Sequence, residues 1–370
     1  MMPSNTCSQK AVRLIAYYLP QYHPIPENDR WWGKGFTEWT NVAKAMPLFS
    51  GHNQPRLPAD HGFYDLRNPE VRAQQSELAR SYGIEGFCYW HYWFQGKRLL
   101  DRPMNELLAT GQPDFPFCLG WANESWTRSW TGEEVEILLK QTYSSEDDLV
   151  HARWLASVFG DSRYIKIDNR PLLILYRPPA LPDALRTTDT FRSECVRLGI
   201  PEPYIVGRDT HNFGVDMRQF GCDMTESSSP ALGLLPGVSA PPGRLSDWLR
   251  NRRLGVWSDL KIYDYKEACR LGEEARPAHP HIPSIFVDWD NTCRRGRKAI
   301  IITGSTPQLF GSALRTALSS TLSKPREERI ITINAWNEWG EGMYLEPDQR
   351  WGLGYLEEVK RELLFASQLK

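Results

Sequence analysis

Eight short runs rich in β-branched, aromatic and other apolar residues recur along the chain, with helical patterns or long connections between them. Strands that alternate with helices favour a parallel sheet covered by its crossover helices. Eight such units, with a last helix after the eighth, predict an α/β fold that is a single (β/α)8 TIM barrel. The runs are "RLIAYYLP" (13–20), "GIEGFCYW" (83–90), "PFCLGWA" (116–122), "RPLLILYRP" (170–178), "PYIVGRD" (203–209), "CDMTESS" (222–228), "IPSIFVDWD" (282–290) and "RIITINAW" (329–336).

The segments between the runs carry helix start signals. Asn68-Pro69 and Thr306-Pro307 each place a capping side chain before a proline at the first helical position. Ser145 is expected to cap a further helix. A doubly wound open sheet is the competing architecture. It would need a glycine-rich turn after the first strand, and the sequence has none there.

Domain organisation follows from the absence of an internal repeat or an obvious linker. We expect an N-terminal tail over residues 1–12 and one catalytic barrel over residues 13–370. The connections 21–68, 91–112 and 236–263 are long, and the first is rich in Pro, Gly and Trp. Long loops of this kind after barrel strands are usually functional. We therefore expect them to form a lid over the C-terminal face.

Charge and cysteine content exclude several classes of protein. The chain has 44 basic and 45 acidic side chains, a net charge of -1, which predicts no nucleic-acid partner and no attraction to an anionic membrane. No apolar run is long enough for a transmembrane segment, and the N-terminus lacks the apolar core of a secretory signal. The seven cysteines form no C-x-x-C pair, which is typical of buried thiols in a reducing compartment. These features favour a cytoplasmic location.

Polar and aromatic residues gather where most of the predicted strands end. Active sites of TIM barrels lie at these C-terminal ends. The chain is rich in aromatic residues, with 15 Trp and 15 Tyr, many of them beside Asn, Asp or Glu. Aromatic faces stack on sugar rings while carboxylates and amides bind hydroxyls, so the pattern predicts a carbohydrate site. The candidate substrate-binding residues are Tyr22, His23, Trp90, His91, Trp121, Asn123, Glu124, Trp126, Arg208, Asp288, Asp290, Asn337 and Trp339.

The stretch "INAWNEWGEG" (333–342) supplies the candidate catalytic residues, Glu338 and Glu341. Cleavage of a glycosidic bond needs one carboxylic acid to protonate the leaving oxygen and one carboxylate as base or nucleophile. Two close carboxylates also titrate together, so that one can stay protonated while the other is ionised. Gly340 and Gly342 would let both side chains face one cavity. The alternative is that Glu338 caps a helix and Glu341 is solvated.

Two other motifs leave alternatives open. Glu124, in "GWANESW", could pair with Glu338 as the acid/base of a conventional retaining glycosidase, or bind a sugar hydroxyl. Asp288 and Asp290, in "DWDN", resemble the D-x-D of metal-dependent glycosyltransferases, but on a strand they would equally form a sugar-binding pair. We favour sugar binding, and no His or Cys spacing indicates a zinc site. We therefore expect neither a metal nor a cofactor.

Five long motifs resemble the WbsX-like family, and the resemblance runs from about Arg13 to Phe365. They are "YYLPQYHPIPENDRWWGKGFTEWTNV", "QPRLPADHGFYDLRNPEVR", "GFCYWHYWF", "PFCLGWANESWTRSW" and "INAWNEWGEGMYLEPD". The family is named a glycosyltransferase but is related to glycoside hydrolase family 99, whose members are metal-independent retaining (β/α)8 enzymes acting on α-mannosides. The first half of the chain is similar to the WbsX-like branch far more than to the mannosidases, so the resemblance implies no sugar-binding residues.

For this sequence the resemblance implies a base and an acid. Glu338 would deprotonate the sugar's own 2-hydroxyl, whose oxygen attacks the anomeric carbon and forms a 1,2-anhydro sugar. Glu341 would act as the acid, and then as the base for the water that opens the ring.

The first functional hypothesis is therefore a retaining glycoside hydrolase acting on a polysaccharide or oligosaccharide. The alternatives are a glycosyltransferase of O-antigen, lipopolysaccharide or capsule biosynthesis, and a sugar-binding barrel without catalysis. The last would predict loss of one glutamate, and both are present.

Overall fold

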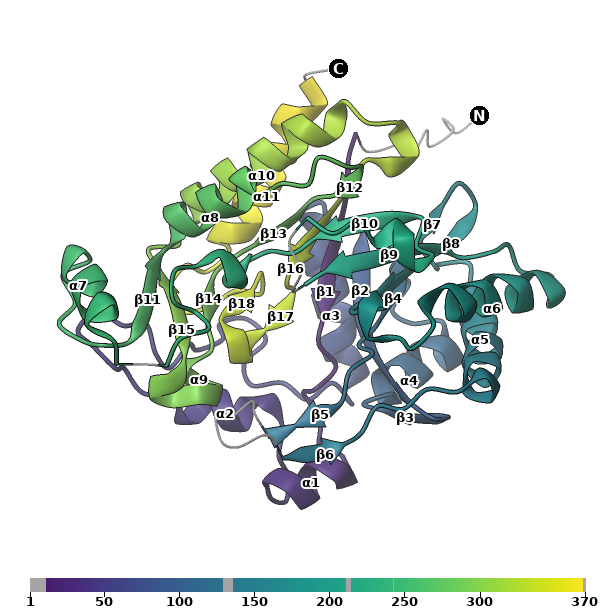
Figure 1. The fold of residues 1–370 in the computed structure, drawn as a ribbon, viewed down its shortest axis with the longest axis horizontal. Helices are drawn as coiled ribbons and strands as arrows, with labels where there is room; N and C mark the ends of the chain where they lie inside the picture. Colours follow the sequence, from purple (N-terminus) through teal and green to yellow (C-terminus); the bar gives the residue numbers. More distant parts are fainter. Residues whose placement is uncertain (1–10, 129–135, 211–213, 242, 369–370) are drawn as a thin grey trace.

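A parallel sheet wraps into a nearly closed barrel with helices around it (Figure 1). The computed structural model describes residues 11–128, 136–210, 214–241 and 243–368. All eight predicted strands are present, and the predicted TIM barrel is confirmed. In chain order they are β1 (Arg13–Tyr18), β2 (Gly86–Phe94), β4 (Phe117–Trp121), β8 (Arg170–Leu175), β9 (Tyr204–Asp209), β10 (Met224–Ser227), β12 (His281–Ile282) with β13 (Ser284–Phe286), and β16 (Ile330–Asn334).

The seventh barrel strand is divided at Pro283. Its two parts pair with the strands on either side, and this pairing closes the barrel. Before the proline, β12 pairs with β10, and after it β13 pairs with β16. The Ser227 hydroxyl spans the break by donating to the Ile282 oxygen at 3.4 Å and accepting from the Ser284 N–H at 3.3 Å. Proline lacks the N–H that a continuous ladder would use. The single strand predicted over 282–290 is thus wrong in detail, because this stretch holds parts of three short strands.

The outer layer consists of helices that follow the barrel strands. They are α3 (Pro69–Ser81), α4 (Arg102–Thr110), α5 (Ser145–Phe159), α6 (Ala184–Arg197), α8 (Tyr265–Glu274), α10 (Pro307–Leu322) and α11 (Gly354–Gln368). Asn68 and Thr306 cap α3 and α10 as predicted. Ser144 caps α5 instead of Ser145, accepting from the Asp147 N–H at 3.2 Å. The prediction is off by one residue, because the capping residue is the one whose backbone is still extended.

Further short elements lie in the connections, which the sequence analysis treated as loops. Figure 1 places α1, α2, α9, β5 and β6 toward the carboxyl ends of the barrel strands. Strands β11, β15 and β14 form a second sheet. The bounds are α1 (Pro26–Trp32), α2 (Glu38–Lys44), β3 (Lys97–Leu99), β5 (Trp126–Thr127), β6 (Ile137–Leu139), β7 (Lys166–Ile167), α7 (Leu245–Arg253), β11 (Lys261–Asp264), β14 (Trp289–Asp290), α9 (Thr292–Arg295), β15 (Ile300–Thr303), β17 (Asn337–Glu338) and β18 (Met343–Tyr344).

Three expectations concern the chain as a whole. Most of the predicted tail, residues 1–10, lies outside the described residues. Within the described ranges, no helix is long and apolar enough to cross a membrane. The six cysteines in those ranges are free, and four of them are buried.

A buried carboxylate ties the barrel strands together from inside. Glu226 of β10 is fully buried and accepts hydrogen bonds from the hydroxyls of Tyr17 and Thr332, the latter at 2.6 Å. Its carboxylate also lies 3.7 Å from Nε of Arg208. These partners come from β1, β16 and β9, so one side chain links four strands. A buried charge is tolerated only when it is paired and hydrogen-bonded in this way.

Replacing Glu226 tests this link. Glu226→Ala should lower the free energy of unfolding by about 3–5 kcal/mol, because Arg208 and two hydroxyls lose their buried partner. Urea unfolding followed by circular dichroism measures the change. The control is Glu327→Ala at an exposed position, which should stay within about 0.5 kcal/mol of the original chain. Equal stability of both variants would contradict the assigned role.

Candidate active site

The eighth strand runs into a tight turn that carries both candidate catalytic glutamates. Glu338 ends β17, and Glu341 ends the short 3-10 helix η7 (Trp339–Glu341). Gly342 adopts φ +68°, a left-handed conformation that favours glycine. At Gly340 an added Cβ would lie 2.1 Å from Oε1 of Glu38. The glycines are therefore required for the turn and for the close approach of Glu38 from the first long connection.

One guanidinium group holds three carboxylates. Nη2 of Arg294 lies 2.6 Å from Glu338, Nη1 lies 2.8 Å from Glu341, and Nε lies 2.8 Å from Glu38. The Arg294 side chain is 8% exposed and that of Glu38 is fully buried, whereas Glu341 keeps 25% of its side chain exposed. The cation thus fixes the two glutamates of the turn beside each other, and Glu341 is the more exposed of the two.

Burial and mutual repulsion shift the titration of this pair. Burial raises the pKa of Glu338 to about 8, with the charges of Glu341 and Glu38 adding to the rise and Arg294 opposing it. Burial also raises the pKa of Glu341, again against Arg294. Groups this close take up protons as a unit. Near neutral pH the pair can hold one proton, which general acid–base catalysis requires.

Arg208 and Trp90 lie near the same pair. The Arg208 guanidinium carbon is 4.6 Å from the ring centroid of Tyr17 and 5.8 Å from that of Trp90, and Trp90 stacks on Tyr17 at 4.7 Å. The positive charge of Arg208 acts on Glu341 by lowering its pKa, against the larger effect of burial. These two predicted residues therefore share a region with the candidate catalytic pair.

Glu124 forms an ion pair with Arg177. Its carboxylate is 3.3 Å from Nη1 of Arg177, and 38% of its side chain is exposed. Burial raises the pKa of Glu124, Arg177 opposes the rise, and the charge of Glu341 adds to it. Glu124 therefore lies close enough to Glu341 for the two charges to interact.

Several predicted substrate-binding residues instead hold the turn in place. Tyr22 donates to the Asn337 backbone oxygen and accepts from the Trp339 N–H at 3.1 Å. The Asn337 side chain binds both backbone groups of Leu19, at 2.7 and 3.0 Å. Trp339 donates to the Glu346 carboxylate at 2.7 Å. All three predicted residues are fully buried or nearly so, and they support the site from behind.

His91 and Trp121 lie on the opposite side of their strands, against the helix layer. Neighbouring residues of a strand face opposite sides, so His91 points away from the side taken by Trp90. Nε2 of His91 is 3.0 Å from Nε2 of His151, and Trp121 packs edge-on against the same ring. Burial lowers the pKa of His91 to about 3. The structure does not bring these two residues to the glutamate pair.

Three further predicted residues have local structural contacts. Asn123 exchanges hydrogen bonds of 2.8 Å with the backbone of Arg177. Trp126 packs edge-on against Tyr92, 5.0 Å between centroids. His23 is 2% exposed, and burial lowers its pKa. Asn123 is thus bound to the end of the fourth barrel strand, and Trp126 packs on Tyr92, whose pKa the charge of Glu338 helps to raise.

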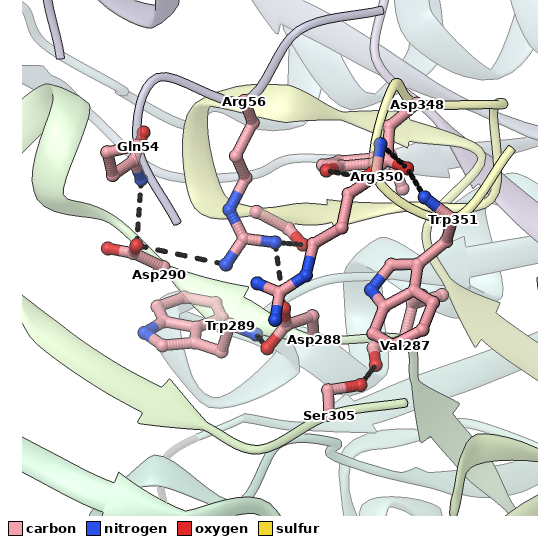
Figure 2. A network of polar contacts seen from close by, with 12 residues as sticks. Gln54, Arg56, Val287, Asp288, Trp289, Asp290, Ser305, Asp348, Arg350 and Trp351 are labelled. Carbon is pink, nitrogen blue, oxygen red and sulfur yellow. Dashed lines mark hydrogen bonds and ion pairs between the residues drawn. The ribbon is translucent and has the colours of Figure 1, made fainter. Parts of the chain in front are cut away.

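The two aspartates of "DWDN" bind the first long connection (Figure 2). Asp288 is 2.7 Å from Nη1 of Arg56, and Asp290 accepts from Gln54 at 2.7 Å and lies 2.8 Å from Nε2 of His52. Burial alone would raise the pKa of Asp290, but the His52 bond and the Arg56 charge outweigh it and lower that pKa. Both carboxylates are thus engaged by protein side chains. In the described part of the chain, no cluster of three or more His, Cys, Asp or Glu could hold a metal ion.

The model of the family "Glycosyltransferase WbsX" matches residues 14–359. The chain belongs to the WbsX family. Two proteins from strains of Xanthomonas campestris pv. campestris, each described as "Uncharacterized protein WxcX", are 40% identical to it over 356 residues, which is 95% of this chain and 49% of theirs. This WbsX chain therefore spans about half the length of the curated relatives it matches.

Solved structures share its fold. A "Glycoside hydrolase-like protein" aligns with a TM-score of 0.59 at 15% identity, covering 95% of this chain and 94% of that one. The GH99 endo-alpha-mannosidase from Bacteroides thetaiotaomicron aligns with a TM-score of 0.57 at 13% identity, covering 96% and 98%. The WbsX chain thus has the barrel of GH99-like proteins.

Sequence reasoning missed Arg294 and Glu38. Arg294 lies in the basic run "RRGRK", where nothing distinguishes it from a solvated arginine, and Glu38 lies in "FTEWTN" within the first connection. They are 256 positions apart, so no spacing rule relates them. The only available signal was that the loop after strand 1 and the end of strand 7 belong to the same face of the barrel.

Removal of Arg294 should destabilise the WbsX chain, and more so at high pH. The pKa of Glu338 rises from 4.5 to about 8 on folding, so its contribution to stability is present below pH 4.5 and lost as the pH rises through 8. Without the cation the glutamate pKa values rise further, and the loss is larger. Arg294→Gln should lower the free energy of unfolding by about 3 kcal/mol or more at pH 8, and by less at pH 4.5.

Urea unfolding at both pH values measures this difference. The control is Arg297→Gln, which removes an exposed ion pair with Asp259 and should change stability by less than about 1 kcal/mol. A loss for Arg294→Gln that is the same at both pH values would show that the cation does not govern the titration of the glutamates.

Proposed function

We propose that this chain is a retaining glycoside hydrolase that cleaves a glycosidic bond in a polysaccharide or oligosaccharide with Glu338 and Glu341. The observation that carries the proposal is the pairing of these two glutamates on Arg294, at the C-terminal end of the eighth barrel strand. Two carboxylates with raised pKa values, one of them partly exposed, are the groups that glycosidic cleavage needs. The GH99-like fold supports the same reaction class.

The reaction proceeds in two steps. In the first, Glu341 gives its proton to the leaving glycosidic oxygen while Glu338 removes the proton of the sugar's 2-hydroxyl. That oxygen then displaces the leaving group from the anomeric carbon and forms a 1,2-anhydro sugar. In the second, Glu341 takes a proton from water, which opens the ring at the anomeric carbon, and Glu338 returns its proton to O2. Two inversions give net retention, and both glutamates regain their initial protonation.

We assign the substrate contacts to residues that lie beside Glu338 and Glu341. Trp90 offers a ring face, while Arg208 and Glu124 offer charged groups for sugar hydroxyls. The likeness to a protein titled an endo-alpha-mannosidase supports an α-mannoside-like substrate. Arg294 holds both catalytic carboxylates in position and favours their ionised forms.

Substitution of the two glutamates tests the mechanism. Glu338→Gln and Glu341→Gln should each lower kcat by about 10²- to 10⁴-fold, because each removes a proton-transfer group. Proton NMR of an oligosaccharide panel follows the anomeric signals, and the first product should keep the configuration of the substrate. Unchanged thermal unfolding of both variants shows that the fold is intact.

Glu328→Gln, a partly exposed glutamate before the eighth strand, is the matched control and should leave kcat unchanged. Near-normal turnover by either active-site variant, or a first product of inverted configuration, would contradict the assigned roles.

A glycosyltransferase is the second candidate, because the matching family is described as one. On this reading a nucleotide sugar would be consumed only in the presence of an acceptor, as in O-antigen, lipopolysaccharide or capsule synthesis. The same NMR experiment with nucleotide sugars and acceptors separates the two functions. A chelator adds a second criterion, since a loss of activity that Mn²⁺ restores would assign a metal to Asp288 and Asp290.

Substitution of Glu124 tests whether Glu341 or Glu124 is the acid/base of the hydrolase. We expect Glu124→Gln to raise KM with little change in kcat, since its carboxylate serves the substrate and not the proton transfer. On a substrate whose leaving group departs without protonation, we also expect azide to restore turnover of Glu341→Gln by replacing water in the second step. If azide instead rescued Glu124→Gln and gave a glycosyl azide of retained configuration, Glu124 would be the acid/base and the Glu338–Glu341 assignment would fall.

A further inference from the structure

Helix α7 turns its leucines toward solvent and its polar residues toward the protein. It lies in the connection 236–263, at the edge of the molecule in Figure 1. Leu245 is 71% exposed and Leu249 is 50% exposed, whereas Asp247 and Asn251 are buried. Asn251 donates to the backbone oxygen of Ser258 at 3.0 Å and to that of Leu260 at 2.7 Å. A surface helix ordinarily has the reverse orientation, so the outward face of α7 is built for contact with something other than water.

A tryptophan beside the helix extends this apolar surface. Trp257 is 71% exposed and meets Trp248 of α7 at 5.9 Å between centroids. The guanidinium carbon of Arg252 lies 4.7 Å from the Trp257 ring and 4.9 Å from the Trp248 ring. These cation–π contacts fix the exposed indole next to the helix. The exposed Trp257 side chain therefore belongs to an ordered surface.

The exposed charged residues of α7 and its N-cap are all arginines. Arg244, Arg252 and Arg253 are exposed, and within the described ranges no carboxylate forms an ion pair with any of them. The acidic residue of α7, Asp247, is buried and pairs with Arg250 at 2.9 Å. The patch is thus cationic although the whole chain has a net charge of -1. From the net charge we expected no contact with an anionic membrane. The net charge does not show this local excess of positive charge.

We propose that this face, formed by Leu245, Leu249, Arg252, Arg253 and Trp257, docks on an anionic lipid surface. Leucine and tryptophan side chains enter the boundary between headgroups and acyl chains, while arginines bind the phosphates. The binding is peripheral and reversible, since three apolar side chains bury little area. The proposal does not depend on the hydrolase or transferase reaction.

Other occupants fit the face less well. A sugar subsite would combine an aromatic ring with amides or carboxylates that bind hydroxyls, and the outward face of α7 presents neither. A second copy related by a two-fold axis would bring the same arginines against each other. Exposed arginines on a face that itself carries no carboxylate instead match a surface of phosphates.

Vesicle binding tests the proposal. The full chain should co-sediment with vesicles of phosphatidylcholine mixed with phosphatidylglycerol, but not with phosphatidylcholine alone, and high salt should weaken the binding. The double variant L249S/W257S should lower the partition coefficient by about tenfold or more, because it removes two membrane-inserting side chains. R252E/R253E should abolish binding by reversing the charge. The control is V196S/L198S on and beside α6, which removes two exposed apolar side chains elsewhere and should bind like the original chain.

Absence of binding to the anionic vesicles, or undiminished binding by L249S/W257S, overturns the proposal. A dimer in sedimentation velocity that is lost in L249S/W257S would assign the face to a second copy and also overturn it. Thermal unfolding checks each variant, and R252E/R253E keeps the test decisive if the double apolar substitution fails to fold. Glycan turnover without vesicles should be the same in all variants.

Discussion

The candidate site depends on one buried cation. Arg294 neutralises part of the charge of Glu38, Glu338 and Glu341, and it opposes the rise in pKa that burial causes at Glu338 and Glu341. One positive charge cannot balance three negative ones in a place largely closed to water. The cluster therefore retains a proton, and the strand-end turn keeps both an acid and a base. The missing Cβ of Gly340 is what lets Glu38 reach this arginine.

The first long connection is as much a part of the site as the barrel. It supplies Glu38 to the arginine, and its Arg56 and Gln54 bind the aspartates at the end of the seventh strand. The segment is thus packed over the ends of strands seven and eight by buried ion pairs, which are lost together if it moves away. We infer that the first long connection is held in one position and keeps Arg294 and the turn in contact.

Residue patterns predicted the barrel because each buried strand needs its own run of apolar residues, and eight such runs are visible. They predicted Glu338 and Glu341 because glycines and aromatics mark their turn. The supporting residues were harder to assign. Tyr22 and Asn337 looked like sugar ligands, yet a buried turn must satisfy its own backbone groups, and these side chains do so. His91 stands one position from Trp90, and a strand gives no local sign of which of two neighbours faces inward. Arg294 pairs with residues that follow the neighbouring strands eight and one but lie far from it in sequence, so only the fold reveals it.

The family's name and its hydrolase-like fold are compatible with one site. On the proposed mechanism the first step is the same for a hydrolase and for a retaining transferase, because both open the glycosidic bond with Glu338 and Glu341. The second step differs only in which hydroxyl gives its proton to Glu341. That hydroxyl belongs to water or to an acceptor sugar, according to what the exposed side of the site admits. Glu124 and Arg177 pair with each other and are each more than a third exposed. On this mechanism the two functions differ in what reaches the glutamates from the exposed side, and not in the glutamates themselves.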